Sequence, residues 1–377
     1  MQNSILKGRL EDQRLLTGRG TYVSDWNLPG QAHACFLRSD RAHAGIVSID
    51  ASAALAHPGV LAVLTGEDVF AAGYKSLPAA LPMKGRDGAE LIKPMRPALA
   101  QGKVRFVGEP VAIVVAETAV AAQDASELVM VEYADLPAVT VAADALKPGA
   151  PQLFDEAPGN MVFDFGAGDE AAATAAFASA ARIVKLTVDN TRVVGNPMEP
   201  RGCLGAYDAA SGDYTLYACT QGATTMRTQV AAVLGVPPEK VGIGAQDVGG
   251  GFGVRFNLYP EYCATLLAAR KLGRPVKWVG TRSEVFLSDE QARDVLQQGE
   301  LALDASGRIL GMRFDMIANL GAYLCPTGPF VNTAAVVNCL SGVYDVQAVY
   351  ARIKLAVTNT APMASSSAAW STSLSRM

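Results

Sequence analysis

The first part of the chain alternates between short apolar runs and alanine-rich stretches. Apolar runs that suit buried strands occupy residues 32–38 and 111–115, and segments 51–57 and 119–131 have helical character. Residues 141–160 contain three prolines and two glycines, which is typical of a linker. The pattern therefore predicts a mixed α/β unit that ends at a boundary near residue 150.

The second part of the chain repeats this alternation with clearer turn signals. Strands are expected at 213–220, 240–246 and 275–280, and helices at 224–234 and 259–272. Two further strands flank Asp304-Ala305-Ser306-Gly307, a sequence suited to a hairpin turn. The whole chain is thus predicted to be an α+β protein.

The last fourteen residues, 364–377, differ in character from everything before them. Six are serine, one is charged, and their apolar positions follow neither a helical nor a strand period. We expect an aberrant, disordered tail, and its abrupt start suggests a frameshift, a split gene or an early stop.

The composition narrows the possible partners and location. Half of the 377 residues are hydrophobic and 18% are charged, so the chain can bury a large core. The net charge is −4, and no run rich in lysine and arginine occurs, which disfavours nucleic acid as a partner. Neither a secretory signal nor an apolar run long enough for a membrane span is present, so a cytoplasmic protein is expected.

The spacing of the cysteines and the positions of the histidines argue against several kinds of metal site and active site. The six cysteines lack CxxC spacing, so we expect buried thiols rather than an iron–sulfur cluster or a zinc site. All three histidines, His33, His43 and His57, lie in the first 60 residues. A histidine base or metal ligand is therefore hard to place in the rest of the chain.

The main chemical motif is Gly249-Gly250-Gly251-Phe252-Gly253, between a predicted strand and a predicted helix. Consecutive glycines allow a backbone to approach a bulky anionic or metal-bound group, although a tight structural turn would use the same residues. No Gly-Lys-Ser/Thr follows, and the spacing is not Gly-x-Gly-x-x-Gly, which argues against a nucleotide-binding protein. The loop by itself names no ligand.

A series of further motifs surrounds this loop in a fixed order. They are LTGRGTY (16–22), VLAVLTG (60–66), VGEPVA (107–112), NPMEPRG (196–202), TQ (220–221), QDVGGGFG (246–253), YPEY (259–262), RPVKWV (274–279) and RSE (282–284). Together they resemble the large subunit of the molybdenum hydroxylases, the family of xanthine dehydrogenase, aldehyde oxidase and carbon monoxide dehydrogenase. The resemblance covers roughly residues 8 to 363.

The resemblance implies a fold and a set of boundaries. After an N-terminal segment, 1–16, it implies an α/β-hammerhead domain over 17–145. The first half of a molybdopterin-binding domain would follow over 146–363. The family subunit is about twice as long as this chain, so the chain resembles its N-terminal half.

Site residues follow from the resemblance position by position. Gln221 would donate an amide hydrogen bond toward the apical oxo ligand of molybdenum, although it could also be a surface amide at a strand end. Phe252 and Gly253 would lie against the metal centre, while Gly250 and Gly251 would leave room for the pterin and its phosphates. No catalytic residue is expected in this chain, because the glutamate base of the family lies in the missing C-terminal half.

Other positions support weaker expectations. Glu199 and Arg201 could form a local ion pair, and Glu109 could hold the hammerhead domain against the cofactor domain. Purine-oxidising members carry a glutamate four residues after the loop phenylalanine, where this chain has Phe256. A purine substrate is therefore disfavoured.

The implied activity is hydroxylation of an aldehyde, an aromatic heterocycle or carbon monoxide with oxygen from water. The cofactor would be molybdenum-molybdopterin, in its cytosine dinucleotide form. Iron–sulfur clusters and FAD would lie on a small and a medium partner subunit, in a dimer of heterotrimers. The chain alone is expected to be inactive, and the alternative is a non-catalytic remnant or assembly fragment that binds partner subunits without cofactor.

Overall fold

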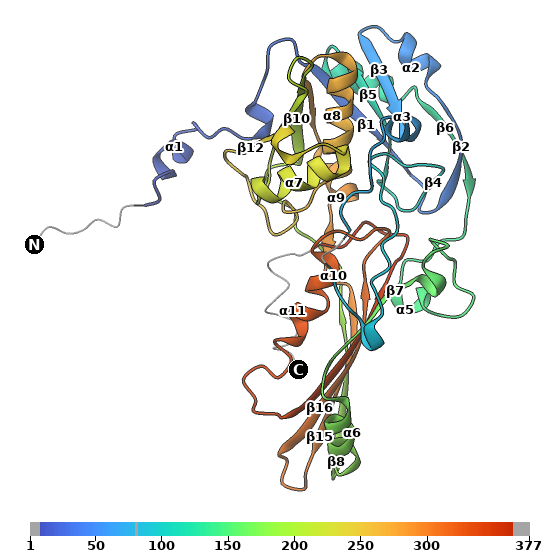
Figure 1. Cartoon of the computed structure of the whole chain (residues 1–377), viewed down its shortest axis with the longest axis vertical. Helices are drawn as coiled ribbons and strands as arrows, with labels where there is room; N and C mark the ends of the chain where they lie inside the picture. The colour runs from blue at the N-terminus through green and yellow to red at the C-terminus, as the bar shows by residue number, and fades with distance from the viewer. Residues whose placement is uncertain (1–7, 80–81, 365–377) are drawn as a thin grey trace, which may run out of the picture.

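A seven-stranded sheet forms the centre of the upper part of the molecule (Figure 1). The structure, a computed structural model, describes residues 8–79 and 82–364. The order of the strands across the sheet is β12 (Val241–Gly244), β11 (Asp213–Ala218), β10 (Gly202–Asp208), β13 (Val276–Val279), β1 (Ala32–Arg38), β5 (Pro110–Ala116) and β3 (Val60–Thr65). Each of the strands predicted in these regions is confirmed, some of them two or three residues shorter than expected.

This sheet joins residues from both sides of the predicted boundary near residue 150. Strand β1 pairs in parallel with β13, with Ala32 opposite Val276 and His33 opposite Lys277. Strand β13 then pairs antiparallel with β10. The early and late parts of the chain therefore share one continuous sheet and one hydrophobic core.

Two helices complete this core. Helix α7 (Ala223–Leu234) and helix α8 (Pro260–Leu272) are those predicted at 224–234 and 259–272. Both end at a glycine in the left-handed region, Gly235 with φ 69° and Gly273 with φ 62°. Helix α8 is buried from Pro260 to Ala269 and contacts β10, β13 and β5 of the sheet as well as α7.

A smaller sheet completes the early region, in the order β4 (Lys103–Val104), β2 (Ala44–Asp50) and β6 (Met130–Asp135). The helices here are α2 (Ser52–Ala56), α3 (Gly66–Ala71) and α4 (Ala119–Ser126). The helix predicted over 119–131 was too long, since its last residues belong to β6. The β-branched Val129 and Val131 pack beside Val114 there, which favours an extended backbone.

The lower part of Figure 1 is a long five-stranded sheet. Its order is β7 (Met161–Gly168), β17 (Ala348–Ala356), β16 (Ile309–Asn319), β15 (Val295–Leu303) and β8 (Arg182–Asn190). The hairpin predicted at Asp304–Gly307 is confirmed, since β15 and β16 pair antiparallel and Asp304 Oδ1 accepts a hydrogen bond from Ser306 N at 2.8 Å. Helix α6 (Glu170–Ala178) packs on one face of the sheet, and α10 (Gly328–Val331) and α11 (Ala334–Val337) lie on the opposite side.

The segment predicted as a linker is packed rather than open. It contains α5 (Ala142–Ala145), and Leu153 and Phe154 belong to the lower hydrophobic core. Asn160 is fully buried, and its side chain accepts from Leu153 N and donates to Ala145 O, both at 3.0 Å. The position of the domain boundary itself stays a prediction.

Several smaller features complete the description. The remaining elements are α1 (Asp12–Leu16), α9 (Arg282–Ser288), the strand pair β9 (Val193–Val194) and β14 (Gln291–Ala292), and 3₁₀ turns at Val23–Asp25, Arg86–Gly88, Pro158–Asn160 and Pro238–Lys240. Within the described ranges, every helix is too short or too polar to cross a membrane. The expectation of buried cysteines is wrong for the exposed Cys339 and the half-buried Cys35. The predicted tail lies outside the described residues except for Ala364, which is buried.

Candidate cofactor site

The glycine loop connects the end of β12 to the start of α8, as the sequence predicted. Gly250 and Gly253 adopt φ values of 110° and 87°, which only glycine reaches without strain. Phe252 lies between them with φ 51°, in the left-handed region that an aromatic residue rarely adopts. Its side chain is 46% exposed, so this strained turn directs a large apolar ring toward the surface.

Gln221 lies against this loop and holds it by hydrogen bonds. Its side-chain Oε1 accepts from Gly253 N at 2.9 Å and from Arg255 N at 3.2 Å, and its own backbone N donates to Arg255 O at 3.0 Å. Gln221 is an exposed residue, and within the described residues no hydrogen bond engages its amide nitrogen, because the carbonyl end of the amide faces the loop. The side chain therefore anchors the loop and still presents a free donor.

The glycines are required by close contacts as well as by backbone angles. A Cβ built on Gly251 would lie 2.4 Å from Gln221 Cδ, and one on Gly250 would lie 3.2 Å from Pro197 Cβ. One on Gly249 would lie 2.5 Å from Glu199 Cβ. The structure thus brings the predicted residues together, with Gln221 against Gly251 and Gly253, and adds Gly249, whose role the sequence did not reveal.

Glu199 is attached to the loop and not to Arg201, so the predicted ion pair between them is wrong. Its Oε2 accepts from Gly249 N at 2.7 Å, and its Oε1 accepts from Val23 N at 2.9 Å. Arg201 instead pairs with Glu261 and Asp289. The Glu199 carboxylate binds backbone N–H groups in place of the Arg201 guanidinium, which is buried with its own two carboxylates.

A buried ionic network lies directly beneath the loop. Asp289 accepts from Arg201 Nε and from an Arg255 guanidinium nitrogen, both at 2.7 Å. Glu261, in the first turn of α8, pairs with Arg201 at 2.5 Å and with Arg38 at 2.8 Å. Burial alone would raise the pKa of Glu261, but the two arginines outweigh it and lower the pKa to about 2.

Sequence reasoning missed this network. A carboxylate in the first turn of an otherwise apolar helix, at Glu261, and an acidic pair after a short helix, at Asp289 and Glu290, were the available signals. Glu290 is fully buried and contacts Arg96 at 3.1 Å and Asn257 at 2.7 Å. Burial raises its pKa despite these partners.

Glu109 has the role that the sequence suggested. Its Oε1 accepts from Tyr323 Oη at 2.7 Å, and its Oε2 accepts from Arg105 N at 2.6 Å. Tyr323 belongs to the later part of the chain and Glu109 to the early part, so this carboxylate links the two. It is buried, and burial raises its pKa.

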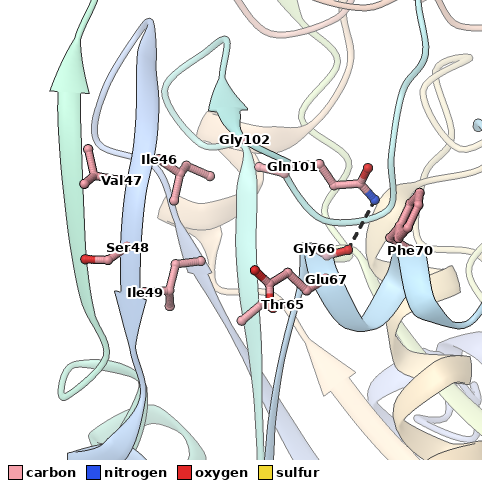
Figure 2. A pocket seen from close by; sticks show the side chains of 11 residues that line it. Ile46, Val47, Ser48, Ile49, Thr65, Gly66, Glu67, Phe70, Gln101 and Gly102 are labelled. Carbon is pink, nitrogen blue, oxygen red and sulfur yellow. Dashed lines mark hydrogen bonds between the residues drawn. The ribbon is translucent and has the colours of Figure 1, made fainter.

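A different hollow opens on the early domain, away from the glycine loop. Figure 2 shows Ile46–Ile49 of β2 on one side and Thr65, Glu67 and Phe70 on the other, with Gln101 donating to Gly66 O. Its volume is about 410 Å³, and its lining includes none of the predicted site residues. The glycine loop lies elsewhere, and its residues are half-buried except for the exposed Phe252.

The glycine loop has features that a large anionic cofactor needs. The backbone of Gly249 to Gly251 carries no side chains, the exposed residue Gln221 has an amide donor beside it, and Arg255 fixes the loop from below. The residues present therefore fit a pterin-type group bound against the loop.

Comparison with known proteins gives the family. Residues 17–137 match the model of the aldehyde oxidase and xanthine dehydrogenase a/b hammerhead domain, and residues 153–373 match that of the molybdopterin cofactor-binding domain. The chain belongs to the molybdenum hydroxylase large-subunit family. The predicted fold, a hammerhead domain followed by molybdopterin-binding sequence, is confirmed.

Individual relatives agree with this assignment. The chain is 39% identical to the carbon monoxide dehydrogenase large chain of Hydrogenophaga pseudoflava over 93% of its own length, and 38% identical to the nicotine 6-hydroxylase large subunit of Paenarthrobacter nicotinovorans over 94%. The crystal structure of quinoline 2-oxidoreductase from Pseudomonas putida 86 superimposes with a TM-score of 0.87 at 39% identity, over 95% of this chain and 45% of that one. The chain spans 44% and 43% of the two curated relatives, which is less than half of each.

Proposed function

We propose that this chain binds a molybdopterin molybdenum cofactor at the glycine loop and provides that part of a hydroxylating oxidoreductase. The observation that carries this proposal is the position of Gln221, an exposed residue whose carbonyl oxygen holds the loop while no hydrogen bond within the described residues engages its amide nitrogen. A purely structural glutamine would need only the first of these arrangements. When bound, the cofactor supplies the two-electron chemistry that transfers water-derived oxygen to the substrate.

The chain's own residues would bind and orient this group. Gly250 and Gly251, whose side-chain positions are filled by Pro197 and Gln221, would present bare backbone to the pterin and its phosphates. Phe252 and Gly253 would lie against the metal. Gln221 would direct its amide donor to the metal centre. Arg255 and Asp289, paired at 2.7 Å beneath the loop, keep its backbone fixed while ligand contacts form on the outside.

The substrate class and the partners are part of the same proposal. We favour an aldehyde, an aromatic heterocycle or carbon monoxide over a purine, because the half-buried Phe256 occupies the position of the purine-binding glutamate. The curated relatives are named as a large chain and a large subunit. We therefore propose a small iron–sulfur subunit and a medium FAD subunit as partners, in a cytoplasmic dimer of heterotrimers, with the cofactor in its cytosine dinucleotide form.

The direct test measures the cofactor itself. The chain would be produced in a host that makes molybdopterin, and molybdenum and released pterin would be quantified per chain for the wild type and for Gly251→Val. The expected result is cofactor in the wild type and its loss in the variant. A wild-type chain that folds and binds partner subunits but contains no molybdenum would favour the remnant instead.

A further inference from the structure

The segment before β1 is attached by side chains to the residues just before the glycine loop and to β13. We call residues 21–26 the N-terminal strap. Asp247 accepts from Thr21 N at 2.7 Å, and Lys277 Nζ donates to Ser24 O at 2.7 Å and to Trp26 O at 2.8 Å. The strap is thereby fixed at both ends.

We propose that Glu199 is a positioning residue that couples this strap to the glycine loop. This inference rests on the proposed function only for its consequence, the retention of cofactor. The coupling itself depends on contacts within the chain. The Glu199 carboxylate acts on the loop and the strap and takes no part in the buried ion pairs of the arginines.

All four polar groups of Glu199 have partners, and three of these partners lie between residues 249 and 255. Its backbone N donates to Gly249 O at 3.0 Å, and its carboxylate Oε2 accepts from Gly249 N at 2.7 Å. Its backbone O accepts from Arg255 at 3.2 Å. The fourth group, Oε1, accepts from Val23 N of the strap at 2.9 Å.

The chemistry of this position requires a carboxylate. Two N–H groups approach the side chain, one on each oxygen, and the residue is only 8% exposed, so little water is available to replace a lost partner. A glutamine has one acceptor, and its amide N–H groups would face the second donor. Either Val23 N or Gly249 N would then lose its bond, and repulsion between the NH2 group and that donor would shift the side chain and weaken the bond to the other.

The same contact controls the position of the glycines. A Cβ on Gly249 would lie 2.5 Å from Glu199 Cβ, so the side chain packs on the loop as well as bonding to it. Gly249 leads directly into Gly250 and Gly251, the residues that contact Pro197 and Gln221. Release of Gly249 would therefore loosen the part of the loop proposed to face the cofactor.

The test compares Glu199→Gln with Lys277→Met in the full chain. Lys277→Met releases the strap from β13 but leaves Glu199 and the loop unchanged. Hydrogen–deuterium exchange would be followed in peptides covering 21–26 and 248–256, with thermal unfolding as the check that each variant folds. Molybdenum content would be measured on the same preparations.

We expect Glu199→Gln to speed exchange about tenfold or more in both peptides, because a backbone bond is lost or weakened in each. Lys277→Met should speed exchange in the strap alone. Molybdenum should fall in Glu199→Gln and stay close to the wild-type level in Lys277→Met. Should Glu199→Gln fail to fold, Glu199→Asp, whose carboxylate is too short to reach both donors, should speed exchange in at least one of the two peptides.

Unchanged exchange of 248–256 in a folded Glu199→Gln variant, or an equal increase in Lys277→Met, would overturn the coupling. A wild-type chain without molybdenum would instead count against the proposed function. The exchange results would stand in that case, so the two failures are distinguishable.

Discussion

Gln221 occupies the space that any side chain on Gly251 would need. A Cβ on Gly251 would lie 2.4 Å from Gln221 Cδ and 2.7 Å from its Oε1. Gly251, unlike Gly250 and Gly253, does not have a positive φ, so its requirement is steric and not conformational. The loop and the glutamine are therefore constrained as one unit.

This contact predicts the effect of Gly251→Ala. The new methyl group must displace the Gln221 side chain, which breaks its bonds to Gly253 N and Arg255 N. We expect a loss of about 1–3 kcal/mol in the free energy of unfolding, measured by urea denaturation. Gly242→Ala in β12 is the matched control, since the nearest atom to its Cβ is 3.7 Å away, and it should change stability by less than about 0.5 kcal/mol.

Two substitutions of Gln221 distinguish the role of its carbonyl oxygen, which holds the loop, from that of its amide nitrogen, which is proposed to face the cofactor. Gln221→Ala removes the acceptor of two backbone N–H groups and should increase proteolysis of the loop, so this variant would not leave the loop intact. Gln221→Glu keeps an acceptor toward the loop but replaces the outward donor with a carboxylate oxygen. It should preserve protease resistance and lose molybdenum. Wild-type molybdenum content in Gln221→Glu would remove the amide donor from the site.

The sequence predicted the fold well where local patterns and packing agree. The glycine loop, the hairpin at Asp304–Gly307 and helix α8 follow from turn chemistry and periodicity, and each appears within about two residues of its expected position. The helix over 119–131 failed because packing of Val129 and Val131 overrides their place after an alanine-rich stretch.

The contacts that hold the glycine loop in place were not predictable from one sequence. Gln221, Glu199 and Asp289 lie far apart along the chain, and only the fold brings them beneath one loop. The Glu199–Arg201 prediction failed for the same reason. The backbone N–H groups of Val23 and Gly249 engage the Glu199 carboxylate, whereas Glu261 and Asp289 engage the Arg201 guanidinium. Motifs thus indicated which residues matter, whereas the partners depend on the tertiary structure.

Glu261 predicts an acid-sensitive step in unfolding. Its pKa is lowered from 4.5 to about 2 in the folded chain, so it contributes stability above pH 4.5 that is lost as the pH falls toward 2. Glu261→Gln should cost about 3–5 kcal/mol at pH 7, because Arg201 and Arg38 remain buried with fewer counter-charges. The difference from wild type should shrink as the pH is lowered through this window. Asp144→Asn, which breaks an exposed pair with Lys147, should cost less than about 1 kcal/mol.

Glu109 predicts the opposite pH dependence at the contact between the early and late parts of the chain. Burial raises its pKa, although the hydroxyl of Tyr323 and the charges of Arg105 and Arg96 oppose the shift. A carboxyl group whose pKa is raised by folding stabilises the chain below its ordinary pKa of 4.5 and loses that contribution as the pH rises through the raised value. The ionised form at neutral pH is therefore a cost to this contact.

Glu109→Gln should remove that cost and keep the geometry. The amide oxygen can accept from Arg105 N in place of Oε2, and the amide nitrogen can donate to Tyr323 Oη in place of Oε1. We expect the unfolding temperature of Glu109→Gln to equal or exceed that of the wild type at pH 8. Near pH 4 the two unfolding temperatures should be equal, or that of the wild type should be the higher. Glu109→Ala, which leaves both donors without a partner, should lose about 1–3 kcal/mol at every pH. A difference between wild type and Glu109→Gln that stays constant from pH 4 to pH 8 would show that the carboxyl group does not titrate in this range, and that its charge is compensated by Arg105 and Arg96.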